Sequence, residues 1–493
     1  MEYLDPISDD CMISLGRCSV GLLWYVTTRP HTIATLFDQV LRYQLWRFIN
    51  TTTGKVHLER LHRQYGPIVR VSPNELSFGS VESWKAIYGA SSTERRIPPK
   101  GEFWDIFGAG FAKSCIASER DPARHGEMKK MLSAAFSQRS LLEQEGIVSE
   151  TIDLFVRIIG EEAAAAELGP AAGLDMVKWF DMVSFDVLGE MAFGESFHSL
   201  ESGSRHFWSA LVEDHMYLVT LIDNIAHLGA VAKMMGYLIP SRLLVKNKVS
   251  QYSRDKVDKI LSSNSRRKDF ISLLVSKVHN GEMDKEELAA HVSTLVIAGG
   301  ETVATSLSGT IFFLLRHPER MRRLTNEIRD RFAQYEDITA AEAQRLPYLQ
   351  AVINESLRLY PPASQGFPRT SPGFQVHGQH IPAGTEIYTS TWTVSHDEQY
   401  FLEPMSFLPE RWLDTKTTDR REASQPFSLG PRGCLGRNFA WMEINLILSK
   451  MLWTYNLELV DQDIDFVGLG HVFIMWSKPK LHVKLRKSAE TLI

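Results

Sequence analysis

The stretch Phe427-Ser-Leu-Gly-Pro-Arg-Gly-Cys-Leu-Gly-Arg-Asn-Phe-Ala440 surrounds a single cysteine, Cys434, with three glycines, one proline and two arginines. Glycine lets a backbone bend tightly, so the N–H groups of this loop can approach the sulfur. The helix that starts after the loop and the neighbouring arginines favour the thiolate over the thiol. The pattern therefore predicts a loop shaped around one sulfur that can ligate iron. A buried, inert cysteine in a turn is the alternative.

The rest of the 493-residue chain has ordinary globular composition, with 44% hydrophobic and 23% charged residues. No linker rich in Ser, Gly or Pro divides it, so we predict one large domain, residues 55–493, after an N-terminal segment, residues 1–54. A formal net charge of −5 gives no reason to expect a nucleic-acid partner. The four cysteines form no C-x-x-C pair, which argues against a disulfide framework and a structural zinc site.

The N-terminal segment is predicted to associate with a membrane without a clear spanning helix. Residues 12–26 are apolar but contain Arg17, and they are fewer than the roughly 20 apolar residues that span a bilayer. Residues 33–48 carry apolar side chains at helical spacing. This pattern suits a helix that lies in a membrane interface and equally a helix that packs on the protein's own core.

Most of the large domain has helical periodicity. Helices are predicted at 124–137, 151–194, 206–228, 284–316, 318–334, 339–359 and 437–455. Short strands are predicted at 67–79 and 375–390, where β-branched residues alternate with turn formers. The expected fold class is therefore mainly α with a small β portion.

The cysteine loop resembles the haem-binding motif of the cytochrome P450 family, F-x-x-G-x-R-x-C-x-G. The five fixed positions are present as Phe427, Gly430, Arg432, Cys434 and Gly436. The resemblance implies the P450 fold, a haem b cofactor, and Cys434 as the axial ligand of its iron. Such a thiolate ligand pushes electron density onto the iron and favours cleavage of the O–O bond.

Two further motifs imply a structural network by the same resemblance. Glu355-Ser-Leu-Arg358 places an acid and a base on one helix face. Taken alone, such a pair is usually a solvated surface ion pair. The later stretch Phe407-Leu-Pro-Glu-Arg-Trp412 resembles the P450 meander, whose arginine joins the acid and the base. The resemblance implies that Glu355, Arg358 and Arg411 hold the core and perform no chemistry.

The stretch Ala298-Gly-Gly-Glu-Thr302 lies within the helix predicted at 284–316, for which Asp284 and Glu287 form a plausible N-terminal cap. Adjacent glycines weaken a helix by about 1 kcal/mol each. They either allow close packing of another helix or leave room for a ligand. By resemblance, Glu301 and Thr302 are the catalytic acid–alcohol pair that delivers protons during oxygen activation.

The propionates of a haem require cationic or hydrogen-bonding neighbours. The stretch His125-Gly-Glu-Met-Lys129 resembles the family's W-x-x-x-R helix, with His and Lys in the two fixed positions. The resemblance implies cofactor contacts from His125, Lys129, Arg369 and Arg432, together with Phe427 and Gly436 of the loop. A surface position is the alternative for Arg369 and Arg432.

The candidate substrate pocket is inferred from family position and is mainly apolar and aromatic, which favours a terpenoid, polyketide or alkaloid skeleton over a charged metabolite. Each of its residues is equally suited to plain core packing. The candidates are Phe103, Trp104, Phe107, Phe111, Ile297, Ala298, Phe367 and Phe473.

Residues 57–78 resemble fungal microsomal P450s of secondary metabolism. The implied reaction is RH + O₂ + two electrons + two protons → ROH + H₂O. About sixty residues follow Cys434, so we expect no fused flavin domain and an external donor, NADPH–cytochrome P450 reductase, with cytochrome b5 as a second candidate partner. The expected location is the cytosolic face of the endoplasmic reticulum membrane. The alternatives are a P450-like isomerase or dehydratase that needs no external electrons and a non-catalytic haem sensor.

Overall fold

The computed structural model of the chain describes residues 58–89, 97–167, 173–226, 246–262 and 270–488. It is about 59% helical and carries several small sheets, which confirms the predicted mainly-α fold with a small β portion. The membrane-associating segment predicted at residues 1–54 lies outside the described residues.

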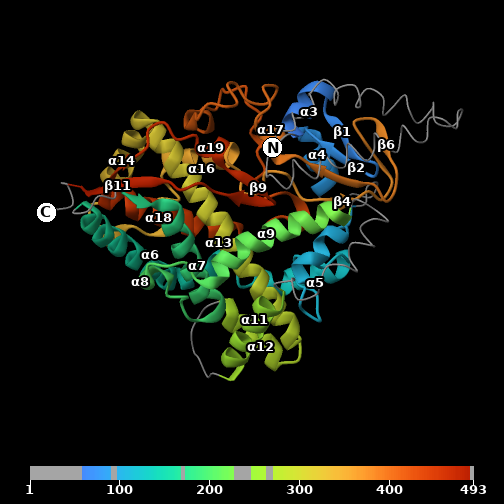
Figure 1. The fold of residues 1–493 in the computed structure, drawn as a ribbon, viewed down its shortest axis with the longest axis horizontal. Coiled ribbons are helices and arrows are strands. Elements are labelled where there is room, and N and C mark those ends of the chain that lie inside the picture. The colour runs from blue at the N-terminus through green and yellow to red at the C-terminus, as the bar shows by residue number, and fades with distance from the viewer. Residues whose placement is uncertain (1–57, 90–96, 168–172, 227–245, 263–269, 489–493) are drawn as a thin grey trace, which may run out of the picture.

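Helices form most of the molecule (Figure 1). The α-helices are α3 (Leu58–Tyr65), α4 (Val81–Tyr88), α5 (Pro122–Ser133), α6 (Gln138–Glu167), α7 (Met176–Phe193), α8 (Ser199–Ser202), α9 (Phe207–Ala226), α11 (Lys246–Ser262), α12 (Phe270–His279), α13 (Lys285–Arg316), α14 (Pro318–Arg331), α15 (Ala340–Ala343), α16 (Pro347–Leu359), α17 (Thr391–Ser395), α18 (Arg437–Thr454) and α19 (Phe466–Leu469). Short 3₁₀ turns are η1 (Glu102–Gly108), η3 (Tyr335–Asp337), η4 (Pro409–Trp412), η5 (Arg421–Ala423) and η6 (Gly430–Arg432).

Within the ranges that the structure describes, the strands form four small sheets. They are β1 (Ile68–Ser72), β2 (Glu75–Phe78), β3 (Leu174–Asp175), β4 (Arg369–Thr370), β5 (Phe374–Val376), β6 (Gln379–Ile381), β7 (Glu386–Thr389), β8 (Tyr455–Leu459), β9 (His471–Phe473), β10 (Met475–Ser477) and β11 (His482–Lys487). The largest sheet has the order β1-β2-β7-β4, and the others are β3-β11-β8, β5-β6 and β9-β10. In the largest sheet β2 and β7 run parallel, so two distant parts of the chain meet there.

The core of the fold is α13, which crosses the middle of the molecule in Figure 1. Asp284 caps this helix by accepting a hydrogen bond from the N–H of Glu286 at 2.7 Å. Glu287, the other predicted cap, is instead buried and pairs with Arg124 of α5 at 2.6 Å. Among the described residues, α13 is the one helix long and apolar enough to cross a membrane, but most of it is buried inside the protein. It is therefore the core helix of the domain.

The adjacent glycines of α13 pack against α7. A Cβ at Gly299 would lie 2.8 Å from Leu188 Cδ1, and a Cβ at Gly300 would lie 2.8 Å from Phe185 Cε2. Both distances are shorter than real Cβ contacts, so a larger residue at Gly299 would force Leu188 to move and one at Gly300 would force Phe185 to move. Of the two explanations that the sequence left open, close helix packing accounts for both glycines.

Two predicted helices are interrupted. The helix predicted at 151–194 is wrong as a single element, because α6 ends at Glu167 and α7 begins at Met176 after the short strand β3. The helix predicted at 339–359 is likewise two helices, α15 and α16, and Pro347 opens the second. Proline suits the first turn of a helix but not its interior.

Candidate active site

The cysteine loop closes on itself through the backbone. The N–H of Cys434 donates to the carbonyl oxygen of Phe427 at 2.9 Å. Gly430 has a φ of +67°, and a Cβ at this position would lie 2.1 Å from the carbonyl oxygen of Tyr88. Only glycine fits this turn, because it has both the required φ and no side chain. The loop thereby fixes the position of the sulfur shortly before α18 begins.

The thiol of Cys434 is accessible, although protein surrounds it. The residue is exposed, yet desolvation by the surrounding protein raises the pKa of the thiol. A hydrogen bond from the backbone of Gly436 and the charges of Lys129 and Arg437 lower the same pKa. Cys434 is therefore accessible and yet desolvated by the protein around it. A metal ion bound to the sulfur would remove the proton outright.

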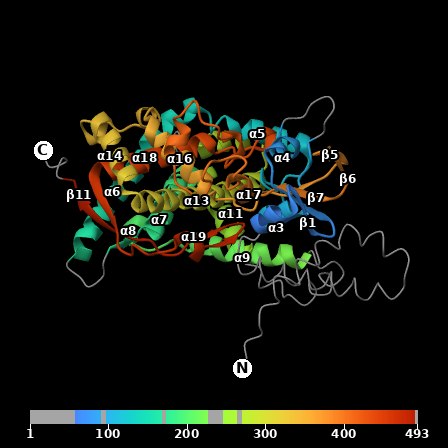
Figure 2. The ribbon, with the colours of Figure 1, turned by 90° about the horizontal axis from the view of Figure 1, so that it is seen from above.

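The middle of α13 also borders accessible space. Ala298 is exposed, whereas Val296 and Gly300 on the same helix are buried. A Cβ at Gly436, beside Cys434, would meet no atom of the described residues within 4 Å. Figure 2 shows α13 between α18 on one side and α9 on the other. Ala298 on α13 and Gly436 in the cysteine loop therefore both border space that no described residue fills.

Cationic side chains gather around the loop. Lys100 and Arg369 are almost fully buried, at 5% and 3% exposed. Burial, together with the positive charges of Arg432 and Arg369, lowers the pKa of Lys100 to about 6. Burial and the charges of Lys100, Arg432, Lys129 and Arg369 lower the pKa of His125 to about 3. The mutual effects show that these five side chains share one region.

Lys129 and Arg432 tie the loop to the rest of the protein. The ammonium of Lys129, on α5, donates to the carbonyl oxygens of Pro431 at 2.6 Å and Gly433 at 3.2 Å. The guanidinium of Arg432 donates to two carbonyl oxygens just before α5, at 2.9 Å each. The predicted role of Lys129 was contact with cofactor carboxylates. Its contacts in the structure are with the loop that carries Cys434.

Arg369 and Lys100 are buried cations whose hydrogen bonds in the described residues go to backbone carbonyls: Lys100 to Ile116 and Ala117, at 2.9 and 2.5 Å, and Arg369 to Pro368 at 3.0 Å. The Nε of Arg369 is buried and has no hydrogen-bond partner in the part of the chain that the structure describes. Its guanidinium lies 5.1 Å from the ring centre of Trp104, and the ammonium of Lys100 lies 4.5 Å from the same ring. Neither cation forms an ion pair with a described carboxylate. Buried charges of one sign are costly unless an opposite charge compensates them.

The predicted substrate-pocket residues fall into two groups. Phe103, Trp104, Phe107 and Phe367 form one aromatic cluster, in which neighbouring ring centres lie 5.2 to 5.8 Å apart. Trp104 is its buried member, and its indole N–H donates to a backbone carbonyl at 2.8 Å. The other predicted residues are placed separately: Phe111 lies under the guanidinium of Arg254, Ile297 and Ala298 lie on α13, and Phe473 lies on β9.

The structure brings Glu355, Arg358 and Arg411 together. Arg358 donates to both carboxylate oxygens of Glu355, at 2.9 and 2.8 Å, and Arg411 donates to the same carboxylate at 3.1 Å. The indole of Trp412 also donates to Glu355 at 2.9 Å, and Asp419 pairs with Arg411. The Glu355 and Arg358 side chains are fully buried. This network joins α16 to the meander and lies apart from solvent.

Glu301 and Thr302 point to different sides of α13. The hydroxyl of Thr302 donates to the carbonyl oxygen of Ala298 at 2.7 Å, on the accessible side of the helix. The carboxylate of Glu301 pairs with Lys478, which follows β10. Consecutive helical residues project about 100° apart, so the two side chains do not contact each other in this conformation.

Comparison with known proteins identifies the family. The family model for cytochrome P450 matches residues 41–484. The chain belongs to the cytochrome P450 family. It is 52% identical over 482 residues to cytochrome P450 monooxygenase BOT4 of Botryotinia fuckeliana, and this alignment covers 97% of this chain and 91% of the relative. It is 54% identical over 442 residues to cytochrome P450 monooxygenase ORF9 of Penicillium roqueforti, with 89% and 86% covered. Trichothecene C-15 hydroxylase of Fusarium sporotrichioides is 34% identical, with 87% of each chain covered.

The family and these relatives establish the class of enzyme. The chain is a P450 monooxygenase, an oxidoreductase with a haem-thiolate cofactor. P450 monooxygenases take electrons from a redox partner and act on lipophilic molecules. Among the predicted functions, the general monooxygenase class is confirmed, and the relatives named here give no support to an isomerase or a sensor.

The residues of the site fit the haem of a P450. Cys434 is accessible to a binding partner such as haem iron, and the unpartnered Nε of Arg369 suits a carboxylate. Lys100 belongs to the same group of buried cations. No local motif marks Lys100, and its signal in the sequence was only its position before the aromatic run Phe103–Phe107.

Proposed function

We propose that this P450 is a fungal microsomal enzyme that inserts one oxygen atom from O₂ into a lipophilic secondary metabolite. The observation that carries the proposal is the Cys434 thiol, which is desolvated but accessible, in a loop whose neighbouring buried cations lack an anion. A haem supplies both the metal for the sulfur and the two carboxylates for the cations.

The cofactor is haem b, and this chain's residues hold it in three ways. Cys434 ligates the iron. Arg369 and Lys100 would receive the propionates, Arg432 would add its positive charge beside them, and the neutral His125 would add a hydrogen-bonding ring, since burial among cations lowers its pKa to about 3. Lys129 keeps the loop closed through two carbonyl oxygens. When bound, the haem supplies the activation of O₂ that side chains cannot perform.

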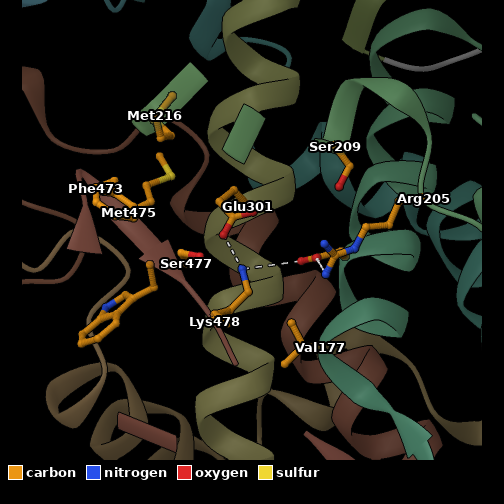
Figure 3. Close-up of a pocket in the computed structure, with 11 residues that line it drawn as sticks. Val177, Arg205, Ser209, Met216, Glu301, Phe473, Met475, Ser477 and Lys478 are labelled. Carbon is orange, nitrogen blue, oxygen red and sulfur yellow. Dashed lines mark hydrogen bonds and ion pairs between the residues drawn. The ribbon is translucent and has the colours of Figure 1, made fainter. Parts of the chain in front are cut away.

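Thr302 and Glu301 handle protons in this proposal. The Thr302 hydroxyl lies on the accessible side of α13, one turn from Ala298, and holds its proton toward the Ala298 carbonyl oxygen at 2.7 Å. Glu301 supplies protons from a neighbouring face of the helix, about 100° away, where it pairs with Lys478 (Figure 3). A positioned acid–base group near the operating pH speeds proton transfer by about 10² to 10⁴.

The substrate is lipophilic because the residues around the proposed site are largely apolar. The cluster of Phe103, Phe107 and Phe367 borders it from one side, with Ile297 and Ala298 on α13 and Phe473 on β9. In this proposal Trp104 packs against the two cations and does not line the substrate pocket, because its ring is buried and contacts Lys100 and Arg369. The relative named trichothecene C-15 hydroxylase supports a hydroxylation as the reaction, and the proposed substrate classes are a terpenoid, a polyketide or an alkaloid.

Electrons come from NADPH–cytochrome P450 reductase, with cytochrome b5 as a second candidate donor, at the endoplasmic reticulum membrane. Of the cations near the cysteine loop, Lys130 and Arg437 are exposed. Lys129 and Arg432 are engaged with backbone carbonyls. Lys130 and Arg437 therefore form the surface that meets an acidic partner, and the encounter is sensitive to salt.

The test combines metabolite profiling with reconstitution. Extracts of a producing strain with and without the gene identify the accumulating precursor. The purified enzyme, with reductase and NADPH under ¹⁸O₂, is expected to convert that precursor to a product that carries one labelled oxygen. Conversion without reductase and without label would instead establish an isomerase or dehydratase.

A further inference from the structure

The segment between η1 and α5, residues 109–121 (the η1–α5 loop), follows the aromatic run of η1 and lies against α13. The Sγ of Cys115 in this loop lies 3.0 Å from the hydroxyl oxygen of Thr294 on α13. Thr294 comes one helical turn before Ala298, the exposed residue in the middle of that helix. The loop therefore lies beside the same accessible part of α13 as the proposed site.

One face of α13 is turned toward this loop. Four residues follow one another at intervals of four, three and four positions, which places them along one side of the helix: Glu287, His291, Thr294 and Ala298. Glu287 and His291 are buried, Thr294 is half-buried and Ala298 is exposed. The buried end of this face thus lies next to the loop, and its exposed end lies next to the proposed site.

An imidazole ring on this face fastens the main chain of the loop. The N–H of Ile116 donates to the Nδ1 of His291 at 3.1 Å. A backbone N–H is always a donor, so Nδ1 is the acceptor and the ring proton lies on Nε2. The Nε2 lies 3.5 Å from Glu287 Oε1. His291 is 0% exposed, so water does not compete for the bond to Ile116.

Ile116 is held through its carbonyl group as well. The ammonium of Lys100 donates to the carbonyl oxygens of Ile116 at 2.9 Å and Ala117 at 2.5 Å. Lys100 belongs to the buried cations that receive the cofactor carboxylates in the proposed function. One residue of the loop therefore joins His291 on α13 to the cations of the cofactor site.

The first half of the loop is held by charged groups that water reaches. Glu286 accepts a hydrogen bond from the N–H of Ala112 at 3.0 Å, and Arg254 of α11 donates to the carbonyl oxygen of Gly110 at 2.6 Å. The side chains of Arg254 and Glu286 pair with each other and are 29% and 23% exposed. Water and salt screen such a pair, so it restrains the loop only weakly. The buried bond to His291 is the stronger restraint.

We propose that His291 is a positioning residue for substrate binding: it accepts the Ile116 N–H and thereby fixes the wall that Phe107 and Phe111 form beside the haem. This inference rests on the proposed function, which assigns the aromatic side chains to that wall. Cys115 Sγ lies 3.7 Å from the carbonyl oxygen of Phe107, so a shift at Ile116 passes to η1 through the adjacent residue. A buried N–H without an acceptor is unfavourable. Without His291 the loop therefore moves until another acceptor reaches Ile116.

Two substitutions separate the acceptor from the volume of the ring. His291→Asn keeps an acceptor, because its Oδ1 stands as many bonds from the backbone as the Nδ1 does, but it loses the outer part of the ring. His291→Leu fills the space and has no acceptor. Histidine and asparagine have similar helix propensities. A role in packing alone is better met by leucine, whereas the proposed role is better met by asparagine.

The first test measures hydrogen exchange of single backbone amides in the haem-loaded protein. The amide of Tyr360, which donates to the Ser356 carbonyl at 2.8 Å inside the core, serves as the reference for global stability. Relative to that reference, the Ile116 amide should exchange about tenfold faster in His291→Leu. It should stay close to its natural rate in His291→Asn. An unchanged rate in His291→Leu, or equal acceleration in both variants, would overturn the proposal.

The natural protein still decides the matter if His291→Leu does not fold. After correction for intrinsic rates, its Ile116 amide should exchange more slowly than its Ala112 amide, which is held in the water-accessible half of the loop. The reverse order would contradict the proposal, because the bond to His291 would then not be the stronger restraint.

The second test measures KM, kcat and the product distribution with reductase, NADPH and the precursor that accumulates in the strain without the gene. In His291→Leu the KM should rise several-fold and oxidation should spread to further positions, because the substrate is less well oriented. His291→Asn should keep the natural KM and product. A His291→Leu enzyme with a lower kcat but the natural KM and a single product would show a merely structural role.

The two tests separate this inference from the proposed function. If the natural protein lacks a thiolate-type spectrum or leaves the precursor unchanged, the proposed function fails, while amide exchange still reports whether His291 fixes the loop. If the natural enzyme oxidises the precursor and the Ile116 amide is unaffected in His291→Leu, only the positioning role of His291 fails.

Discussion

Lys100 holds its ammonium nitrogen 4.5 Å from the centre of the Trp104 ring. The same ring lies beneath the guanidinium of Arg369. Two buried cations on one aromatic side chain form a local concentration of positive charge that is unfavourable until an anion is bound. The arrangement favours the binding of carboxylates. The same two side chains therefore lower the stability of the apoprotein and strengthen its binding of the cofactor.

Replacing Lys100 by methionine should therefore stabilise the apoprotein and weaken haem retention. The first effect follows because burial of Lys100 lowers its pKa to about 6, so the lysine gives up a proton on folding at neutral pH, and Lys100→Met removes that cost. The second follows because Lys100→Met removes a propionate partner. The stability gain is on the order of a few kcal/mol. Urea denaturation of the apoprotein and the rate of haem transfer to an acceptor protein measure the two effects. Lys113→Met, at an exposed lysine of the same segment, is the control and should change neither.

The pH dependence of apoprotein stability has a definite sign. Burial and the neighbouring arginines lower the pKa of Lys100 to about 6, whereas an unfolded lysine keeps a pKa of about 10.4. Between these values the unfolded chain binds the extra proton, so stability increases with pH above about 6. Lys100→Met should lose this slope. An identical slope in both proteins would show that Lys100 does not titrate in the fold.

Glu355→Gln should destabilise the protein by about 3 to 5 kcal/mol, because it leaves Arg358 and Arg411 buried without their shared carboxylate. The loss is measured as a fall in Tm and in the yield of folded protein. The control is Glu161→Gln, which breaks an exposed pair with Arg157 and should cost no more than about 1 kcal/mol. Equal effects from the two substitutions would contradict the structural role of the network.

Thr302→Ala should keep the haem but divert reducing equivalents to peroxide, because the hydroxyl that presents a proton on the accessible side of α13 is lost. Thr302→Ser retains the hydroxyl and should behave as the natural enzyme. The measurement is product and peroxide formed per NADPH in the reconstituted system. Fully coupled turnover in Thr302→Ala would remove Thr302 from the proton path.

Lys130→Glu should raise the KM for reductase several-fold at low salt, and the difference should shrink near 1 M salt, where screening extends over only about 3 Å. Turnover supported by added peroxide bypasses the reductase and should not change. Lys487→Glu, at an exposed lysine on β11, provides the control for a change in net charge. A KM that is unaffected by Lys130→Glu at low salt would place the docking surface elsewhere.

Site residues whose partners lie close by in the sequence could be predicted from the sequence alone. The glycines and the cysteine of the loop lie within ten residues, and the acid–base pair of α16 lies within one helical turn. The mainly-α fold followed from periodicity in the same way. These features are local, so a short stretch of sequence contains the whole signal.

Features that depend on distant parts of the chain could not be predicted. Lys129 contacts backbone carbonyl groups about three hundred residues later in the sequence. Every residue has such a carbonyl group, so the sequence does not indicate which ones Lys129 contacts. Lys100 and Lys478 gain their roles only when separate elements fold together. The interruption between α6 and α7 did have a signal, the Gly169-Pro170 pair, which the apolar periodicity on both sides outweighed.

The ferrous–CO difference spectrum of the purified, haem-loaded protein tests the central claim most directly, because the position of its Soret band reports the atom that ligates the iron. The account predicts the red-shifted band of a thiolate ligand, and its loss in Cys434→Ala. A histidine-type band in the natural protein, or an unchanged thiolate band in Cys434→Ala, would contradict the assignment of Cys434 as the iron ligand.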